Sequence, residues 1–381
     1  MHDCSQTPLL PPYLHEFKAL LRLSRLGLKT YENLRNDGRF GVTHEWMVEA
    51  KLSSCRTINN RSLTRRTCEK RINGFPNYLA RIEDDGEEYD LHFVALFSEM
   101  PDAIPVMCIH GWPGNFLEFL DVLSTFRKKY TPQGLPYHLI VPSLPGYAFS
   151  STPPLHKDWT ISDSARLMHK LMVGLGFESG YAVQGGDIGS YTARSLAAKF
   201  DSCKVNFCIM LCLESVAEDS LRLEEREKEG LNRGDEFGKT GTAYAMEHTT
   251  RPATIGFVLS SSPLAMIGEK FRDWSDTTPS LDQILEAVTF YWLTETFPRA
   301  IYPYRTRYVL HSDPSLYCKR PFGYSWNPKE IAPIAKSWAA TTGNLVWFRR
   351  HTKGGHFAAM EQPDNMANDI ENFLAQVWPV E

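Results

Sequence analysis

The chain has 381 residues, of which 43% are hydrophobic and 23% are charged, and its formal net charge is −4. The chain therefore has no excess of basic charge, and its composition does not favour nucleic acid or an anionic membrane as a partner. The eight cysteines contain no CxxC pair and no zinc-ligand spacing. No stretch reaches the roughly 18 apolar residues of a membrane span, and the first residues do not resemble a signal peptide, so we expect a cytoplasmic protein.

The first 75 residues form a polar lead-in with weak helical patterns at residues 16–23 and 31–34. Residues 51–71 are basic, contain two cysteines and lack any clean period. We interpret this stretch as a surface segment or a partly disordered arm, and not as a nucleic-acid-binding element.

Strands and helices alternate from residue 88 to residue 211. The expected strands are residues 88–97, 105–109, 138–141, 181–183 and 205–211. The helices expected between them are residues 116–128, 162–174 and 191–199. Such alternation predicts a parallel, doubly wound α/β sheet. The cysteines of its apolar runs, Cys108, Cys203 and Cys208, are expected to be buried free thiols.

The alternation stops between residues 213 and 307, where only helical patterns are found, at residues 220–229, 242–248 and 284–296. This stretch predicts an all-helical insertion that forms a lid on the sheet. Short strands at residues 321–324 and 344–348 and an amphipathic helix at 364–378 complete the chain. The expected domains are an N-terminal domain at residues 1–75, a first part of the core at 76–212, the lid at 213–307 and a second part of the core at 308–381.

The most informative stretch follows the expected strand at residues 181–183 and reads Gly185-Gly186-Asp187-Ile188-Gly189-Ser190. This small-x-nucleophile-x-small pattern is typical of the strand-turn-helix elbow of α/β-hydrolases, with Asp187 in the usual place of serine. A carboxylate is ionised at pH 7 and can attack a strained carbon to form an ester. The alternative is a glycine-rich loop whose aspartate only caps a helix.

Hydrolysis of such an ester needs a base and an orienting acid. His356 follows the last expected strand in a Gly-Gly-His loop, where these hydrolases carry their histidine. Glu330 follows the preceding strand and is the candidate acid, although a surface glutamate is the alternative. The backbone N–H groups of Trp112, in the turn after the second expected strand, and of Ile188 are the candidate oxyanion hole.

Four motifs in this order carry a resemblance to a known family: residues 110–116 (HGWPGNF), 141–147 (VPSLPGY), 185–190 (GGDIGS) and 354–357 (GGHF). From about residue 75 to the end, the chain resembles the microsomal-type epoxide hydrolase family, in particular its soluble fungal members. The resemblance implies an α/β-hydrolase fold with an N-terminal meander and a helical lid. It also implies hydrolysis of an epoxide to a vicinal diol, without a cofactor or a metal.

The resemblance assigns Asp187 as the nucleophile, Glu330 as the acid and His356 as the base. It further implies two lid tyrosines that donate hydrogen bonds to the epoxide oxygen, at Tyr244 and Tyr304, with Tyr302 as the second choice for the latter. The partner is then a small epoxide, and a homodimer through the lid is left open. The chain departs from the family in residues 51–71, which lack its tryptophan-rich pattern. It also departs in the lid helix expected near residues 261–270, which is about three residues, nearly one helical turn, shorter.

The sequence also offers other interpretations. Asp187 in the elbow excludes a serine esterase. A haloalkane dehalogenase also uses aspartate but usually has tryptophan directly after it, where this chain has Ile188. A non-catalytic binding protein with this fold is a further alternative. Residues 234–240 imitate a phosphate loop but have the wrong glycine spacing and no preceding strand.

Overall fold

The computed structural model describes residues 2–3, 14–59, 64–211, 223–262, 264–305, 311 and 313–378. Within them, nine strands form one sheet in the order β1-β2-β3-β5-β4-β6-β7-β8-β9. The strands are β1 His2–Asp3, β2 Asn77–Asp84, β3 Glu87–Leu96, β4 Ile104–Ile109, β5 Tyr137–Pro142, β6 Tyr181–Gly185, β7 Cys203–Cys208, β8 Cys318–Trp326 and β9 Gly343–Arg350.

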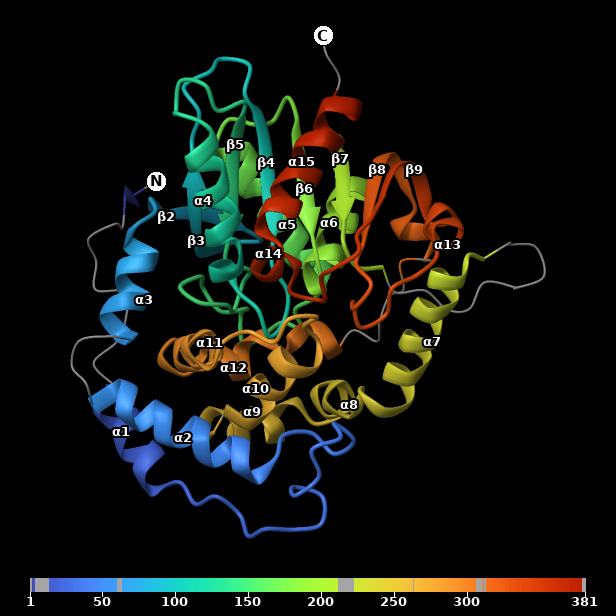
Figure 1. The fold of residues 1–381 in the computed structure, drawn as a ribbon. Helices are drawn as coiled ribbons and strands as arrows, with labels where there is room; N and C mark the ends of the chain where they lie inside the picture. The colour runs from blue at the N-terminus through green and yellow to red at the C-terminus, as the bar shows by residue number, and fades with distance from the viewer. Residues whose placement is uncertain are drawn as a thin grey trace.

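The strands from β4 to β9 pair in parallel, and helices cover both faces of this part of the sheet (Figure 1). Helices α5 (Ile161–Gly174) and α6 (Ile188–Lys199) pack together on one face, and α4 (Leu120–Lys129) packs with α15 (Pro363–Val377) on the other. The predicted doubly wound α/β fold is therefore confirmed. Because β5 and β6 flank β4, the crossover helices diverge between β4 and β6, where such sheets place their ligand sites.

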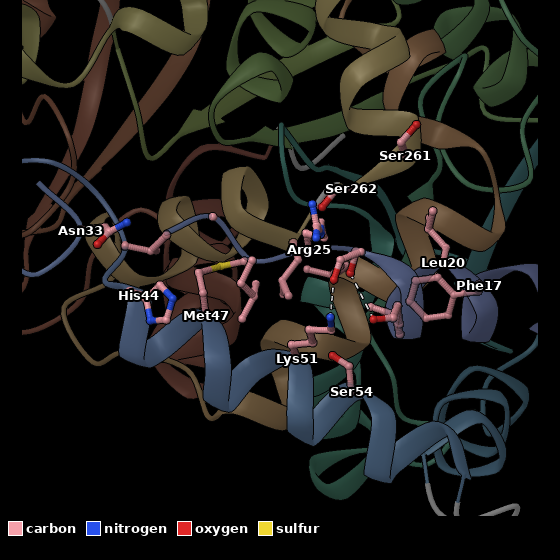
Figure 2. A pocket seen from close by; sticks show the side chains of 17 residues that line it. Phe17, Leu20, Arg25, Asn33, His44, Met47, Lys51, Ser54, Ser261 and Ser262 are labelled. Carbon is pink, nitrogen blue, oxygen red and sulfur yellow. Dashed lines mark hydrogen bonds between the residues drawn. The ribbon is translucent and has the colours of Figure 1, made fainter. Parts of the chain in front are cut away.

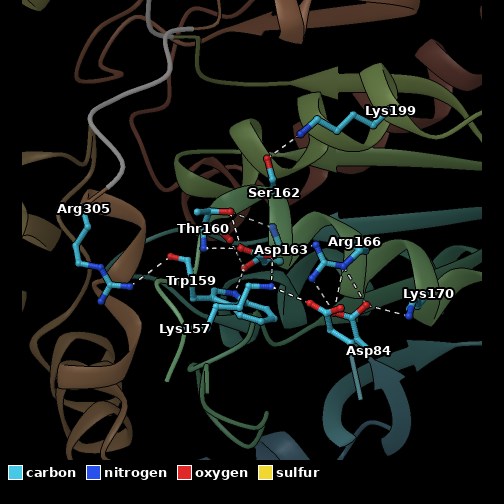
Figure 3. Close-up of polar contacts among 12 residues, drawn as sticks. Asp84, Lys157, Trp159, Thr160, Ser162, Asp163, Arg166, Lys170, Lys199 and Arg305 are labelled. Atoms are coloured by element: carbon cyan, nitrogen blue, oxygen red, sulfur yellow. Dashed lines mark hydrogen bonds and ion pairs between the residues drawn. The ribbon is translucent and has the colours of Figure 1, made fainter. Parts of the chain in front are cut away.

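An antiparallel edge that the sequence patterns did not reveal precedes this core. Strand β2 pairs with β3, and β3 pairs antiparallel with β5. Figure 3 shows the polar contacts that join β2 to α5. The buried Asp84 of β2 accepts hydrogen bonds from Arg166 and forms an ion pair with Lys170. The Arg166 hydrogen bonds, which outweigh burial, lower the pKa of Asp84.

Between β7 and β8 the described chain is helical, and it lies across the C-terminal ends of the parallel strands (Figure 1). We call residues 225–305 the helical insertion. It contains α7 Glu225–Thr240, α8 Ala243–Thr250, α9 Pro252–Ser261, α10 Leu264–Asp273, α11 Leu281–Leu293, α12 Thr296–Ala300 and the short η3 Tyr302–Arg305. Helix α9 was not predicted, whereas α10 overlaps the lid helix expected near residues 261–270. The residues that imitate a phosphate loop, 234–240, lie within helix α7.

The expectation of an arm at residues 51–71 is wrong for its described part. Residues 51–59 belong to α2 (His44–Asn59), and residues 64–71 belong to α3 (Thr64–Asn73). Both helices contact α11, and the side chains of Cys68 and Ile72 are buried, so packing stabilises helices that show no clean sequence period. The patterns at 16–23 and 31–34 had different outcomes, because the first forms α1 (Leu14–Leu23) and the second is only a turn.

Helices α1 and α2 lie against the helical insertion and enclose a mainly apolar cavity of about 200 Å³ (Figure 2). Lys51 at its wall donates a hydrogen bond to the carbonyl of Ser24. In the part of the chain that is described, no helix is both long and apolar enough to cross a membrane. The cysteines expected to be buried free thiols, at positions 108, 203 and 208, are buried and free.

The remaining described elements are small. They are η1 Phe116–Phe119, η4 Pro314–Leu316, α13 Lys336–Ala340 and α14 Ala358–Glu361. Helix η1 begins with a capping box. The Asn115 side chain accepts a hydrogen bond from the Leu117 N–H, and the Glu118 side chain accepts one from the Asn115 N–H. This box fixes the segment that follows the turn after β4.

Candidate active site

Asp187 occupies the turn between β6 and α6. Its φ of 49° and ψ of −129° lie outside the regions that residues with a side chain favour, so its backbone is strained. A Cβ atom on Gly189 would lie 2.3 Å from the carbonyl oxygen of Ile109. One on Gly111 would lie 2.3 Å from the Cβ of Asp187 itself. Only glycine permits this close approach, which sets the carboxylate beside the loop after β4.

One backbone N–H contacts this carboxylate, and a second candidate donor belongs to the next residue of the chain. Strands β4 and β6 pair through Ile109 and Gly185, so the loops that follow them are neighbours. The Trp112 N–H donates a hydrogen bond of 2.7 Å to Asp187 Oδ1. Ile188 is the first residue of α6, and the N–H groups of a helix's first turn have no partner within the helix and carry partial positive charge.

His110 holds the loop that carries Trp112. Burial lowers the pKa of His110 to about 4, so the imidazole is neutral at pH 7. Its Nε2 accepts the Leu144 N–H at 3.1 Å, and its Nδ1 lies 3.1 Å from the Gly111 carbonyl oxygen, to which it donates. The ring therefore joins the loops that follow β4 and β5, and it has a positioning function.

The loops after β8 and β9 bring Glu330 to His356. A parallel bridge between Lys329 and Gly355 continues the pairing of these strands beyond their ends. His356 Nδ1 donates a 2.6 Å hydrogen bond to Glu330 Oε1, and its Nε2 lies 3.5 Å from Asp187 Oδ2. The structure thus brings together three residues that are far apart in the sequence, with the imidazole between two carboxylates.

The charge state of His356 follows from this arrangement. Burial opposes a positive charge on the ring, but the negative charges of Glu330 and Asp187 outweigh it and raise the pKa of His356 well above its usual value. The imidazole is therefore protonated at pH 7.

Two tyrosines of the helical insertion face the same loop. Tyr244 in α8 and Tyr304 in η3 are buried, with ring centroids 5.8 Å apart. Both pack against the indole of Trp112, at centroid distances of 5.1 Å and 5.8 Å. The Tyr302 hydroxyl lies instead 2.7 Å from Ser164 Oγ in α5. Of the two sequence candidates near Pro303, the structure brings Tyr304 next to Tyr244.

His248 and Trp274 complete the surroundings, and sequence reasoning did not single them out. The His248 ring lies 4.8 Å from that of Trp112 and 4.9 Å from that of Tyr304. Burial, helped by the charge of Lys270, lowers the pKa of His248 to about 3. The Trp274 carbonyl accepts the His356 N–H at 2.9 Å. A single aromatic residue within a helix, as His248 is, or directly after one, as Trp274 is, carries no motif, so no sequence signal marked them.

A small cavity of about 20 Å³ is lined by Asp187, His356 and Glu118, among other residues. Its volume suffices for about one water molecule. Glu118 was also not singled out, although its place three residues after Asn115 marks it as part of a capping box. Burial raises the pKa of Glu118 to about 8. The cavity wall therefore contains both a carboxyl group and the imidazole.

Within the described residues, no group of three or more His, Cys, Asp or Glu side chains could hold a metal ion. The groups that can do chemistry at this site are the carboxylates of Asp187 and Glu330, the His356 imidazole, backbone N–H groups and the phenols.

Comparison with known proteins identifies the family. Residues 10–119 match the model of the epoxide hydrolase N terminus, and residues 104–292 match that of the alpha/beta hydrolase fold. The structure of Aspergillus niger epoxide hydrolase is 48% identical, covers 96% of this chain and 94% of its own, and has a TM-score of 0.90. A Dothistroma septosporum protein named "Putative epoxide hydrolase" is 41% identical over 95% of this chain and 87% of its own length. Epoxide hydrolase 1 of Oryctolagus cuniculus is 28% identical over 80% of this chain and 75% of its own length. The chain therefore belongs to the epoxide hydrolase family of enzymes with the α/β-hydrolase fold.

Proposed function

We propose that this enzyme converts an epoxide and water into a vicinal diol through an alkyl ester on Asp187. The observation that carries the proposal is the setting of this carboxylate. Its Oδ1 accepts the Trp112 N–H, and its Oδ2 lies beside a histidine that Glu330 holds on the other side. A nucleophile, a backbone donor and an oriented base are the parts that a two-step hydrolysis requires.

In the first step, Asp187 Oδ2 attacks an epoxide carbon, and the bond between that carbon and the ring oxygen breaks. The ring oxygen gains negative charge and accepts hydrogen bonds from Tyr244 and Tyr304, one of which transfers its proton. Neutral phenols suit this task because they are donors at pH 7. The position of both rings against Trp112, above the carboxylate's own donor, supports these roles.

In the second step, water attacks the ester carbonyl carbon of Asp187. Esterification removes one of the two negative charges that raise the His356 pKa, so the imidazole gives its proton to the tyrosinate through solvent and becomes a base. We place the attacking water in the cavity between His356 and Glu118. Oδ1 carries the negative charge of the tetrahedral intermediate against the N–H groups of Trp112 and Ile188. Its collapse expels the diol oxygen, which takes the proton of the new carboxyl group, and leaves the Asp187 carboxylate beside a His356 that has regained its proton from water.

A haloalkane dehalogenase would use the same nucleophile. The residue after Asp187 is Ile188, however, which offers no indole N–H to a leaving halide. The two adjacent phenols are instead suited to an oxygen leaving group that stays attached to the product.

The test presents purified enzyme with an aryl epoxide and, separately, with a haloalkane, with Asp187→Ala as the inactive control. We expect diol from the epoxide, no halide from the haloalkane, and neither product from the variant. Halide release without diol would overturn the epoxide assignment, and diol formation by Asp187→Ala would overturn the ester mechanism.

A further inference from the structure

A buried cation lies against one of the two phenols. Lys270, in helix α10, is only 4% exposed. Its Nζ lies 4.4 Å from the ring centroid of Tyr244 and 5.6 Å from that of Trp274. Burying an ammonium group has a large desolvation cost, so its place over an active-site ring calls for an explanation beyond packing.

Of the groups around Lys270, the negatively charged ones lie on its own helix, and Tyr244 faces the ammonium from α8. On its own helix, Glu269 forms an ion pair with Nζ, and Asp273 interacts with it electrostatically. Glu269 is the more exposed partner, with a side-chain accessibility of 28% against 5% for Lys270. On α8, Tyr244 faces the ammonium, and His248 is neutral because its pKa lies near 3. Solvent therefore screens the counter-charge more than it screens the side of the cation that meets the phenol.

We infer that Lys270 is a positioning residue for epoxide opening, whose ammonium stabilises the negative charge that Tyr244 and the epoxide oxygen share in the transition state. The phenol must become a better donor as the C–O bond breaks, and a nearby cation favours its charged form. In a site that excludes water, a fixed cation acts at full strength without reorganisation. This inference rests on the proposed role of Tyr244 as a donor.

The test measures the two half-reactions separately, by single-turnover kinetics, in Lys270→Met, Tyr244→Phe and the double variant. We expect Lys270→Met to lower the rate of ester formation at least about tenfold, to leave ester hydrolysis within about twofold, and to move the alkaline limb of ester formation to higher pH. In the Tyr244→Phe background the same substitution should have almost no effect, because the cation then has no phenol to act through. Lys157→Met is the matched control, since Lys157 lies 5.5 Å from the ring of Trp159, which is not one of the candidate site residues, and its loss should change neither step.

Glu269→Gln gives an independent measurement if Lys270→Met does not fold. It keeps the ammonium and removes its counter-charge, so the alkaline limb should move to lower pH. An unchanged or raised limb in Glu269→Gln contradicts the inference, as does a normal rate of ester formation in folded Lys270→Met. If Tyr244→Phe forms the ester slowly and Lys270→Met forms it at the normal rate, this inference alone is wrong. If Tyr244→Phe forms the ester at the normal rate, the proposed donor role of Tyr244 is wrong.

Discussion

The indole of Trp112 lies parallel to the phenol of Tyr244, with ring centroids 5.1 Å apart and planes inclined by 9°. The backbone N–H of the same tryptophan donates to Asp187 Oδ1. One residue of the core therefore contacts both the candidate nucleophile and a candidate donor of the helical insertion. This contact fixes how far the phenol lies from the carboxylate, and hence the space in which an epoxide can be attacked from one side and hydrogen-bonded from the other.

The first prediction concerns the two phenols. Tyr244→Phe and Tyr304→Phe should each slow ester formation by a factor on the order of 100, because each removes one donor to the developing oxyanion. The double variant should be nearly inactive. Tyr302→Phe is the matched control, since its hydroxyl contacts Ser164 in α5, and it should form the ester at the normal rate. Stopped-flow measurement of a single turnover compares the rates of ester formation in the three single variants. A larger loss in Tyr302→Phe than in Tyr304→Phe would reverse their assignment.

The second prediction separates nucleophile from base. His356→Ala should form the ester but not release it, because only water activation requires the imidazole. Intact-protein mass spectrometry should then detect the mass of the enzyme plus one epoxide, and the same adduct should be missing in Asp187→Ala. Failure to trap an adduct with a confirmed substrate would argue for direct attack of water on the epoxide.

The third prediction concerns Glu330. Glu330→Gln should slow ester hydrolysis more than ester formation, with a loss on the order of 100-fold or greater, because the carboxylate stabilises the imidazolium that forms as water attacks. The substitution keeps the 2.7 Å hydrogen bond from Arg233 to the backbone carbonyl of residue 330. Pre-steady-state kinetics resolve the two steps. Equal losses in both would point to a general distortion and not to this role.

Much of the core could be predicted because its local patterns agree with its global fold. The apolar runs at 105–109 and 181–183 become β4 and β6, and the glycines around Asp187 match a turn that only glycine can flank. Strand β2 and helix α9 escaped prediction because contacts distant in sequence stabilise them. The network of Asp84 with Arg166, for example, joins residues 82 positions apart.

The candidate site shows the same division. Asp187 and His356 stand in motifs whose chemistry can be read directly from the sequence. Glu330 has no motif of its own, and its meeting with His356 depends on the bridge between Lys329 and Gly355. The position of Lys270 over Tyr244 depends on how α10 packs against α8, which no pattern within either helix encodes.

The fourth prediction is a pH dependence of stability. The pKa of Glu118 is about 8 in the folded protein against a usual 4.5, so the folded state binds more protons than the unfolded state between these values. Stability must therefore fall as pH rises through this window, by at most about 1.4 kcal/mol per pH unit from this group. Glu118→Gln removes the titration. Urea unfolding at several pH values from 5 to 8 should show the wild-type enzyme losing free energy of unfolding relative to the variant, and a constant difference would contradict a buried neutral carboxyl group.

The last prediction follows the oxygen atoms. If Asp187 Oδ2 attacks carbon, the oxygen added to the first diol comes from the enzyme, and water replaces it in the carboxylate. With enzyme in excess in heavy-oxygen water, the first-turnover diol should therefore carry almost no label, and the peptide containing Asp187 should carry it.

Under multiple turnover the label should pass into the diol, because the labelled carboxylate attacks the next epoxide. If His356 instead drove water directly onto the epoxide, the diol would be labelled from the first turnover and the peptide would stay unlabelled. The two mechanisms thus predict opposite positions of one isotope, and neither outcome depends on knowing the natural substrate. Mass spectrometry of the diol and of the peptide decides between them, and a fully labelled first diol would remove Asp187 from its role as nucleophile.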